Sequence, residues 1–397
     1  MKSEWKTIRA DEFCSLVTDG THDSPKPQAA GRKLITSKHL KGYYLDFESA
    51  NWISSEDYEK VIARSSVEQW DILYSMIGTI GNVYLEKNPV VDYACKNVGI
   101  FKFGGNCNKA YWMYYYLKSP QAMEFIKAHL RGTTQLYVPL ATLREMPVPV
   151  PDEEERNKIV AILRTLDDKI QCSIKINDNL EQQAQSYFQE LFVDNADPEW
   201  AIGTISDLGT VVGGSTPSKA KPEYYTESGI AWITPKDLSI NKSKFVSHGE
   251  NDITELGLKN SSAAIMPEGT VLFSSRAPIG YIAIAAGEVT TNQGFKSVVP
   301  KPEIGTPFVY FFLKNTLPVI EGMASGSTFK EVSGSTMKNV PAVIPDAETL
   351  AKFSDFCAPI FAQQRILEEQ NQSLATLRDN LLPKLMSGEI DVSAVQL

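Results

Sequence analysis

A long internal repeat is the feature that most constrains this chain. Residues 143–151 (LREMPVPVP) return as residues 337–345 (MKNVPAVIP), at an offset of 194 positions. The same offset pairs Gly132 with Gly326 upstream and Leu191 with Leu385 downstream. A repeat of nearly half of the 397 residues is a duplicated domain and not a solenoid unit. The sequence therefore predicts two copies of one module, each followed by a further segment.

The composition is that of a folded, cytoplasmic protein. A hydrophobic content of 43% is enough for the cores of two domains of ordinary size. The start of the chain is polar, which predicts no secretory signal, and the absence of an 18-residue apolar run predicts no membrane span. The five cysteines lack C-x-x-C spacing, so we expect reduced thiols. The excess of acidic residues lies in the segments after each module, and the modules themselves are close to neutral.

A long helix is predicted after each module. Pro147, Pro149 and Pro151 are incompatible with a helix interior and make an extended lead-in, after which Asp152 can cap a helix with an acidic first turn. Apolar residues then recur in steps of four and three, the seam of a coiled coil, and the second copy repeats them in the same register. We predict a first module at 1–151, a helix at 152–195, a second module at 196–345 and a second helix with its tail at 346–397.

The matching registers predict that the two helices pack on each other. Each seam holds an asparagine at the same place, which costs stability but fixes register. The predicted pairing residues are Leu163, Leu166, Ile170, Asn177, Leu180, Ile360, Leu367, Asn371, Leu374 and Leu381. An antiparallel coiled coil of about 35 residues would be roughly 50 Å long and would relate the modules by a pseudo-twofold axis. The alternative is two independent surface helices. Pro359 would either kink the second helix or mark its start.

The expected fold class is α+β, with two tandem mixed α/β modules. Residues 70–85 alternate and are punctuated by glycine, as in strands. Residues 108–130 and 306–322 are rich in aromatic side chains and are predicted to be helices. Such aromatics can stack on nucleic-acid bases, but at helical spacing they favour a core position.

Sequence signatures of catalysis are absent. The chain has no phosphate-binding loop, no dinucleotide fingerprint, no nucleophile elbow and no amino-methyltransferase motif. Its four histidines form no cluster with cysteines, so no metal site is expected. We therefore assign no catalytic residue and expect a binding protein. No set of side chains typical of a catalytic site supports the alternative hypothesis of a hydrolase.

Several short motifs occur in order and in duplicate. They are Asp19-Gly20-Thr21-His22, Thr36-Ser37-Lys38 and Thr234-Pro235-Lys236, the stretches at 272–276 and 291–294, the Gly-Thr-Thr and Gly-Ser-Thr loops, the proline-rich exits, and residues 381–390. Together they cover nearly the whole chain, and in their order and duplication the chain resembles the specificity subunits of Type I restriction-modification systems. One departure is that the first copy has residues 94–97 (ACKN) where the second has residues 291–294 (TNQG).

The resemblance implies a function and a set of partners. Each module would be a target recognition domain that reads one half of an asymmetric, bipartite sequence in double-stranded DNA. The helices would dock two modification (methyltransferase) subunits, which bind S-adenosylmethionine, and restriction subunits would add an ATP- and Mg-dependent nuclease. This chain itself would need no cofactor. The rival hypothesis is a two-module protein-interaction scaffold without DNA specificity, which the modest charge of the modules favours slightly.

The DNA-contacting residues are predicted from side-chain chemistry. Arg and Lys suit guanine, Asn and Gln suit adenine, and Ser, Thr and Lys suit phosphate. On this basis the candidates are Lys38, Lys96, Thr133, Thr134, Gln135, Lys236, Arg276, Asn292, Gln293, Lys296, Ser327 and Thr328. The alternatives are structural: the Gly-Thr-Thr segment can be a simple turn, the Thr-Asn-Gln segment a strand end, and His22 a residue that stabilises its loop.

Overall fold

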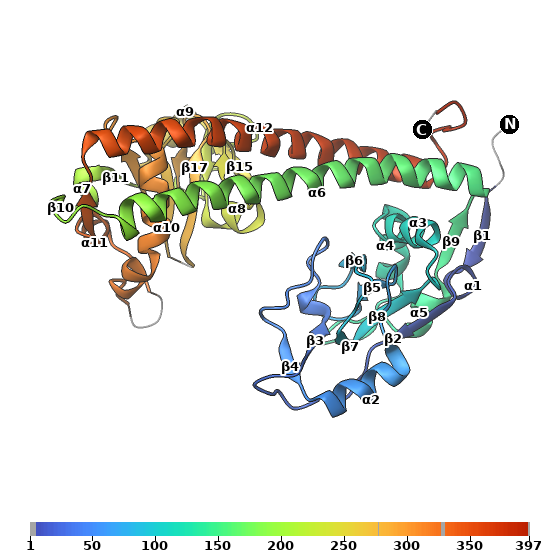
Figure 1. Ribbon diagram of the computed structural model, residues 1–397. Helices are drawn as coiled ribbons and strands as arrows, with labels where there is room; N and C mark the ends of the chain where they lie inside the picture. The colour runs from blue at the N-terminus through green and yellow to red at the C-terminus, as the bar shows by residue number, and fades with distance from the viewer. Residues whose placement is uncertain (1–4, 277, 327–329, 396–397) are drawn as a thin grey trace. The chain divides into compact units, whose positions relative to one another are not determined.

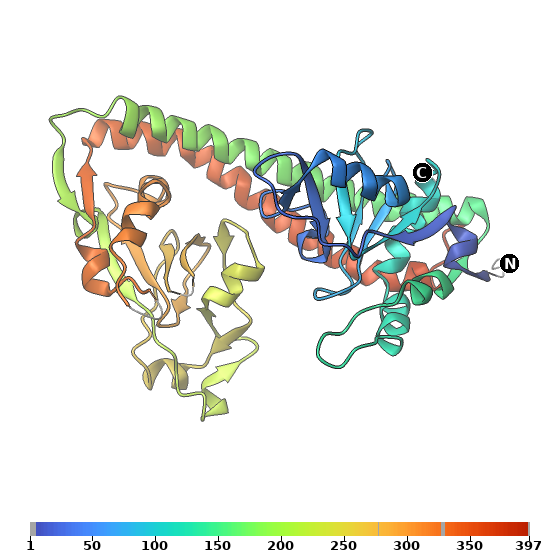
Figure 2. The same cartoon turned by 90° about the horizontal axis from the view of Figure 1, so that it is seen from below.

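The computed structural model describes residues 5–276, 278–326 and 330–395, which form two compact units. Unit 1 contains Met1–Ile170 and Ser373–Leu397, and unit 2 contains Gln171–Gln372. Each unit holds one module and part of each of the two long helices, α6 (Glu153–Gln189) and α12 (Ala347–Met386) (Figures 1 and 2). The division therefore falls inside the helices. The mixed α+β fold with two modules and two long helices confirms the predicted fold class.

The first module is built on three small sheets, with strand orders β1-β9, β2-β8-β5-β6 and β4-β3-β7. Its strands are β1 (Lys6–Arg9), β2 (Leu16–Asp19), β3 (Arg32–Thr36), β4 (Asn51–Ile53), β5 (Ile72–Ser75), β6 (Val83–Leu85), β7 (Tyr93–Lys96), β8 (Val98–Lys102) and β9 (Pro147–Val150). Its helices are α1 (Ala10–Phe13), η1 (Ser37–His39), α2 (Ser55–Ser65), α3 (Cys107–Leu117), α4 (Pro120–Ala128) and α5 (Leu140–Glu145).

The second module repeats this plan, with strand orders β10-β20, β11-β19-β16-β17-β14 and β12-β15-β13-β18. Its strands are β10 (Ala201–Thr204), β11 (Gly209–Gly213), β12 (Tyr225–Thr226), β13 (Ile230–Ile233), β14 (Phe245–Val246), β15 (Asn251–Ile253), β16 (Val271–Ser275), β17 (Ile279–Ala285), β18 (Thr290–Thr291), β19 (Lys296–Pro300) and β20 (Pro341–Ile344). Its helices are α7 (Ile205–Leu208), η3 (Pro222–Tyr224), α8 (Pro235–Ile240), α9 (Glu255–Lys259), α10 (Thr306–Gly322) and α11 (Gly334–Lys338).

The proline-rich exits are the last strands of two-stranded ribbons. β9 pairs antiparallel with β1, and β20 pairs antiparallel with β10. A ribbon of two strands consists only of edges, so proline, which lacks an N–H, is tolerated there. The extended lead-in predicted from Pro147 and Pro149 is thereby confirmed. Each ribbon delivers the chain directly to the start of a long helix.

The aromatic helices form the cores of the modules. Every residue from Ala110 to Leu117 in α3 is buried, as are Phe308 and Phe311 in α10. The core position that their helical spacing favours is confirmed.

The long helices run antiparallel within each unit. In unit 1, Nζ of Lys158 donates to the carbonyl of Ser393, and Asp167 pairs with Arg378 further along. In unit 2, Nδ2 of Asn177 donates to the carbonyl of Gln364 at 3.4 Å, and Nε2 of Gln364 donates back to the carbonyl of Asn177 at 3.2 Å. Further along α6, the ring of Tyr187 lies 6.1 Å from that of Phe353, so rising residue numbers on α6 meet falling numbers on α12. In unit 1 the same direction continues into the tail after α12, where Ser393 lies. α6 ends in a π-helical turn, η2 (Glu190–Asp194).

The predicted pairing residues divide by burial. Leu163, Ile170, Ile360 and Leu367 are buried, and the remaining six are half-buried. Asn177 has Gln364 as its partner across the helices of unit 2. Pro359 lies inside α12, which is continuous around it.

A buried carboxylate ties the first module to the helices of unit 1. Asp167 of α6 accepts hydrogen bonds from the hydroxyls of Tyr115 at 3.0 Å and Tyr43 at 3.2 Å, and pairs with Arg378 of α12 at 2.8 Å. Burial lowers the pKa of Lys118, at the end of the same aromatic helix, to about 8. These contacts fix the module against both helices at once.

Unit 2 has a comparable junction with a different carboxylate. Glu181 of α6 pairs with Lys244 at 2.8 Å and with Lys314 at 2.5 Å. Lys244 is 6% exposed and also donates to Gln364 of α12, whose neighbour Glu368 accepts the main-chain N–H of Lys244. Burial lowers the pKa of Lys244 to about 8. Burial by itself would raise the pKa of Glu181, but the two lysine charges and their hydrogen bonds outweigh it and lower that pKa to about 2.

Candidate nucleic-acid interface

In both modules the turn after the second strand presses against the end of a parallel strand. A Cβ on Gly20 would lie 2.3 Å from the carbonyl oxygen of Cys95, and one on Gly214 would lie 2.4 Å from that of Thr291. The residue after each glycine then donates its N–H to that same carbonyl, at 2.9 Å in the first module and 2.8 Å in the second. Only glycine allows this approach, so the turn is held at one fixed place in each module.

These contacts establish which residues of the two modules are equivalent. Cys95 occupies the position of Thr291, and Lys96 that of Asn292. Val98 occupies the position of Phe295, because they face Ser75 and Ser274 respectively, so the loop between these points is one residue longer in the second module. The alignment of residues 94–97 with residues 291–294 is therefore shifted by one residue at Cys95 but holds at Asn97 and Gly294. The helical turns after β3 and β13 agree with the corrected register, because Thr36 and Thr234 each begin a capping box directly after the strand that pairs with this segment.

One side-chain pair joins the turn to the loop in the first module. Nδ1 of His22 lies 2.8 Å from Oδ1 of Asn97, and Nε2 of His22 lies 3.0 Å from Oδ2 of Asp19. Asp19 is buried and also binds Arg64 at 2.8 Å. Asn97 has a positive φ of 53°, a conformation that asparagine adopts more readily than most residues. The His22 side chain itself is 66% exposed, so its ring faces solvent while its nitrogens are oriented.

The second module has a different pair at the same position. Oγ1 of Thr216 donates to Oε1 of Gln293, which is exposed. Oδ1 of Asn292 is turned inward, where it accepts the N–H of Gly294 at 2.8 Å. Of the two predicted amides, Gln293 is therefore presented to solvent, and the oxygen of Asn292 closes its own loop.

Each module also has a hairpin tip that is bridged to a segment further along the chain. Ser75 and Ser274 each donate to a carbonyl four residues on and accept an N–H seven residues on, which closes the tip between β5 and β6 and the tip between β16 and β17. The loop at 131–137 is bridged to the first tip through Ile77 and Tyr137. Glu331 is bridged to the second tip at Arg276 and also to Ser325.

Two of the three predicted cations of the second module lie beside one carboxylate. Glu331 lies 3.6 Å from Arg276 and 3.7 Å from Lys296, and Nζ of Lys296 also donates to the carbonyl of Gln293 at 3.4 Å. Lys236 lies apart from this group, in an exposed ion pair with Glu250 at 2.5 Å. Arg276, Gln293 and Lys296 therefore form one polar cluster at the surface of the module.

The cations of the first module are more dispersed. Lys38 is exposed on the η1 turn, and its neighbour Ser37 donates to the carbonyl of Asn97 at 3.0 Å. Lys96 reaches the hydroxyl of Ser24. The predicted residues of the glycine-containing loop, which are all exposed, are Thr133, Thr134 and Gln135. Their counterparts Ser327 and Thr328 lie outside the described residues.

Sequence reasoning missed four residues of these clusters: Asn97, Thr216, Glu331 and, as a surface-presented side chain, His22. They could have been found from their positions relative to Gly20 and Gly214. Once the close approach of Gly20 and Gly214 fixes the register, His22 corresponds to Thr216, and each forms a side-chain hydrogen bond with the neighbouring loop, His22 with Asn97 and Thr216 with Gln293. That register is not evident from the sequence, because residues 94–97 and 291–294 share no residue at aligned positions.

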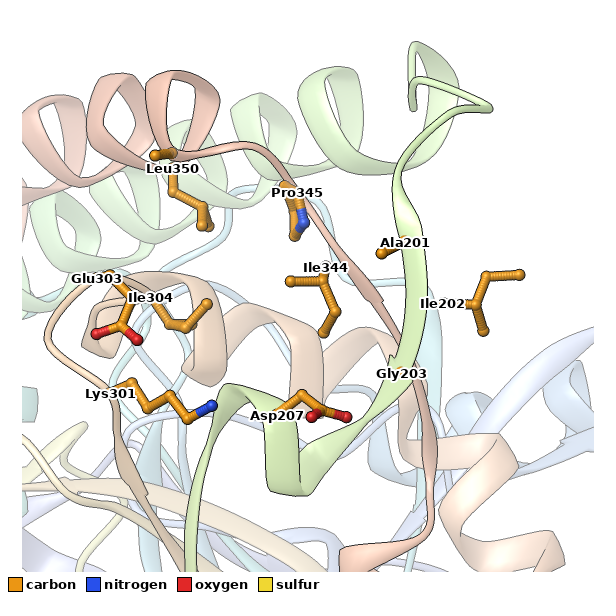
Figure 3. Close-up of a pocket in the computed structure, with 11 residues that line it drawn as sticks. Ala201, Ile202, Gly203, Asp207, Lys301, Glu303, Ile304, Ile344, Pro345 and Leu350 are labelled. Atoms are coloured by element: carbon orange, nitrogen blue, oxygen red, sulfur yellow. The ribbon is translucent and has the colours of Figure 1, made fainter.

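A separate pocket lies beside the β10–β20 ribbon (Figure 3). Its charged lining residues are Asp207, Lys301 and Glu303. The carboxylate of Asp207 is already bound by the N–H and hydroxyl of Thr204, which lower the pKa of Asp207. The described residues place no group of three or more metal-ligating side chains together. Within the same residues, the helices are too short or too polar to cross a membrane.

Comparison with known proteins identifies the family. The family model for the Type I restriction modification DNA specificity domain matches residues 2–182 and again residues 198–377. The chain belongs to this family. The double match agrees with the internal repeat, because each match covers one module and much of the helix that follows it.

Individual relatives of this family align over different lengths. The specificity subunit of the Type I restriction enzyme MjaIX from Methanocaldococcus jannaschii is 39% identical over 47% of this chain, and the chain spans 45% of that protein's length. The HindI specificity subunit from Haemophilus influenzae is 24% identical over 83% of this chain and 88% of its own length. The crystal structure of a Type I S subunit from M. genitalium covers 96% of both chains with a TM-score of 0.58 at 17% identity, which shows a shared fold.

Proposed function

We propose that this chain is the DNA sequence-specificity subunit of a Type I restriction-modification complex. Each module reads one half of an asymmetric, bipartite target in double-stranded DNA. The chain performs no catalysis and needs no cofactor of its own. Two modification subunits carrying S-adenosylmethionine dock on the long helices, and restriction subunits supply the ATP- and Mg-dependent nuclease. The complex works in the cytoplasm.

One observation supports this proposal above the others: the modules share a backbone frame but differ at its exposed positions. The turns at Gly20 and Gly214 are held by the same contacts, whereas the adjoining surface carries His22 and Asn97 in one module and Thr216 and Gln293 in the other. A repeated frame with different polar side chains is what reading two unlike half-sites requires, because base edges are distinguished by donors and acceptors.

The contacts to DNA are assigned by type. Lys38, Lys96, Lys236, Thr133 and Thr134 are assigned to phosphate, because lysine and threonine are common phosphate ligands. Arg276 and Gln293 have the side-chain geometry for bidentate contacts with guanine and adenine. Ser327 and Thr328 stay predictions by analogy with the first module.

The test is reconstitution of the full chain with a Type I modification subunit. The complex is expected to methylate one bipartite sequence in a mapped genome and to lose affinity steeply as salt rises, because phosphate contacts release counterions. Methylation without any sequence preference, under conditions where the complex is assembled, would refute the proposed function.

A further inference from the structure

The position occupied by His22 and Asn97 in the first module, and by Thr216 and Gln293 in the second, is the strongest unassigned feature of the surface. We propose that this pair is a specificity determinant, which makes the bases preferred by one module differ from those preferred by the other. The inference rests on the proposed function and adds to it the residues that distinguish the half-sites.

The first argument is that the frame beneath the pair is the same. In each module a glycine allows the turn to approach a strand end, and the next residue donates its N–H to a carbonyl at that strand end. His22 and Thr216 each follow that donor residue directly. At the turn, the difference between His22 and Thr216 is therefore a difference of side chains on one scaffold, and the loop that supplies Asn97 or Gln293 differs by one residue in length.

The second argument is that each pair is oriented before any ligand binds. His22 is held on both ring nitrogens, by Asn97 at 2.8 Å and by Asp19 at 3.0 Å, and Asp19 is in turn fixed by Arg64 at 2.8 Å. Thr216 is held by Gln293. Side chains locked by neighbours lose less conformational entropy when they bind, so such pairs suit recognition better than free surface residues do.

The third argument is that the pairs are accessible and lie beside groups suited to phosphate. The side chain of His22 is 66% exposed, and Gln293 is exposed as well. The main-chain carbonyl of Asn97 is bound by Ser37, next to Lys38, and the carbonyl of Gln293 is bound by Lys296. Phosphate contacts set the register of a protein on DNA, and the groups between them then meet base edges.

The two pairs present different chemistry to a base. In the first pair both ring nitrogens of His22 are already bound, so the pair offers the carbon edge of the imidazole and the amide N–H donors of Asn97. A hydroxyl beside a longer amide places the donor and acceptor of glutamine further out, where it can form the two hydrogen bonds typical of adenine. We therefore expect the second pair to favour adenine at the base it meets, and the first pair to favour a different base.

The test exchanges the pairs in the reconstituted complex of the full chain with its modification subunit. One variant carries His22→Thr with Asn97→Gln, and the reciprocal variant carries Thr216→His with Gln293→Asn. Genome-wide methylation mapping is expected to show a change of about five- to hundredfold in preference at one or two positions of the altered half-site only. Asp23→Asn, one residue further along the same turn, is the matched control and should leave the target unchanged.

Two outcomes would contradict the inference. An unchanged target in correctly folded exchange variants would overturn the inference, and so would an equal loss of methylation at all sequences, which would mark the pair as part of the scaffold. His22→Gln, which keeps a hydrogen-bond donor beside Asn97, provides a milder variant if an exchange variant fails to fold. Failure of the proposed function is distinguishable, because the unaltered complex would then show no sequence preference.

Discussion

Replacing Glu181 by glutamine tests whether the charged junction of unit 2 holds the second module to the helices. The substitution keeps the shape of the side chain but removes the charge that Lys244 and Lys314 share. Glutamine mimics the protonated acid, and a fall in pKa from 4.5 to about 2 corresponds to about 3 kcal/mol at neutral pH. We expect the free energy of unfolding of unit 2 to drop by that amount.

The dependence of this loss on pH follows from the sign of each shift. The pKa of Glu181 is lower in the folded state, so its contribution is fully present above about pH 4.5 and is lost as the pH falls toward 2. The difference in stability between the wild-type protein and the Glu181→Gln variant should therefore shrink in acid. It should also shrink above pH 8, because Lys244, whose pKa burial lowers to about 8, then loses the charge that Glu181 pairs with.

The assay is hydrogen exchange of the amides of β16, β17 and α10, read by mass spectrometry, since it reports the stability of unit 2 separately from unit 1. Glu268→Gln is the matched control. It breaks an ion pair with Arg365 at 2.6 Å in the same unit, but Glu268 is 62% exposed, and exposed pairs contribute only about 0–1 kcal/mol. A loss for Glu181→Gln no larger than that of the control, or one independent of pH, would refute the reasoning.

Four further changes have distinct expected outcomes. Arg276→Ala should weaken one half-site by roughly 1–3 kcal/mol in a binding titration if it reads a base, and an equal loss on every sequence would instead identify a phosphate contact. Glu331→Gln should strengthen DNA binding and steepen its dependence on salt, since Glu331 otherwise occupies two cations at 3.6 and 3.7 Å, and an unchanged salt slope would contradict that role. Gly20→Ala should lower thermal stability, because its Cβ would lie 2.3 Å from the oxygen of Cys95, and a wild-type melting temperature would show that the turn can shift. Asn177→Leu together with Asn371→Leu should raise the melting temperature while loosening the register of the helices, and unchanged stability and partner binding would argue against their place in the seam.

The sequence was sufficient for the features that repeat. The proline spacing before Asp152 indicated the ribbon and the helix start, and the steps of four and three indicated two packed helices, because both depend on local backbone rules. The burial of α3 followed from the helical spacing of its aromatics. These features depend on the residues of the segment itself and not on contacts with distant parts of the chain.

The site was less predictable, because it is assembled from segments far apart in the chain. Gln293 comes within hydrogen-bond distance of Thr216, and Lys296 within ion-pair distance of Glu331, only once the strands have paired. Asn292 looked equivalent to Gln293 as an adenine reader, yet its oxygen closes the loop on Gly294. The ion pairs of Glu181 could not be predicted either. The pattern of residues along α6 is the same whether a carboxylate faces Lys244 or faces water.

The discontinuous make-up of unit 1 has a consequence for how the protein is made. Unit 2 is one continuous stretch, Gln171–Gln372, whereas unit 1 needs Met1–Ile170 together with Ser373–Leu397. On the ribosome the first module is synthesised first but lacks Arg378, the partner of Asp167, until the last part of the chain emerges. Contacts that span more than 200 positions also carry a large loop-closure entropy and form slowly. The second module is therefore expected to complete its fold before the first, and a nascent chain stopped short of Ser373 should contain a finished unit 2 and an open apolar face on the first module.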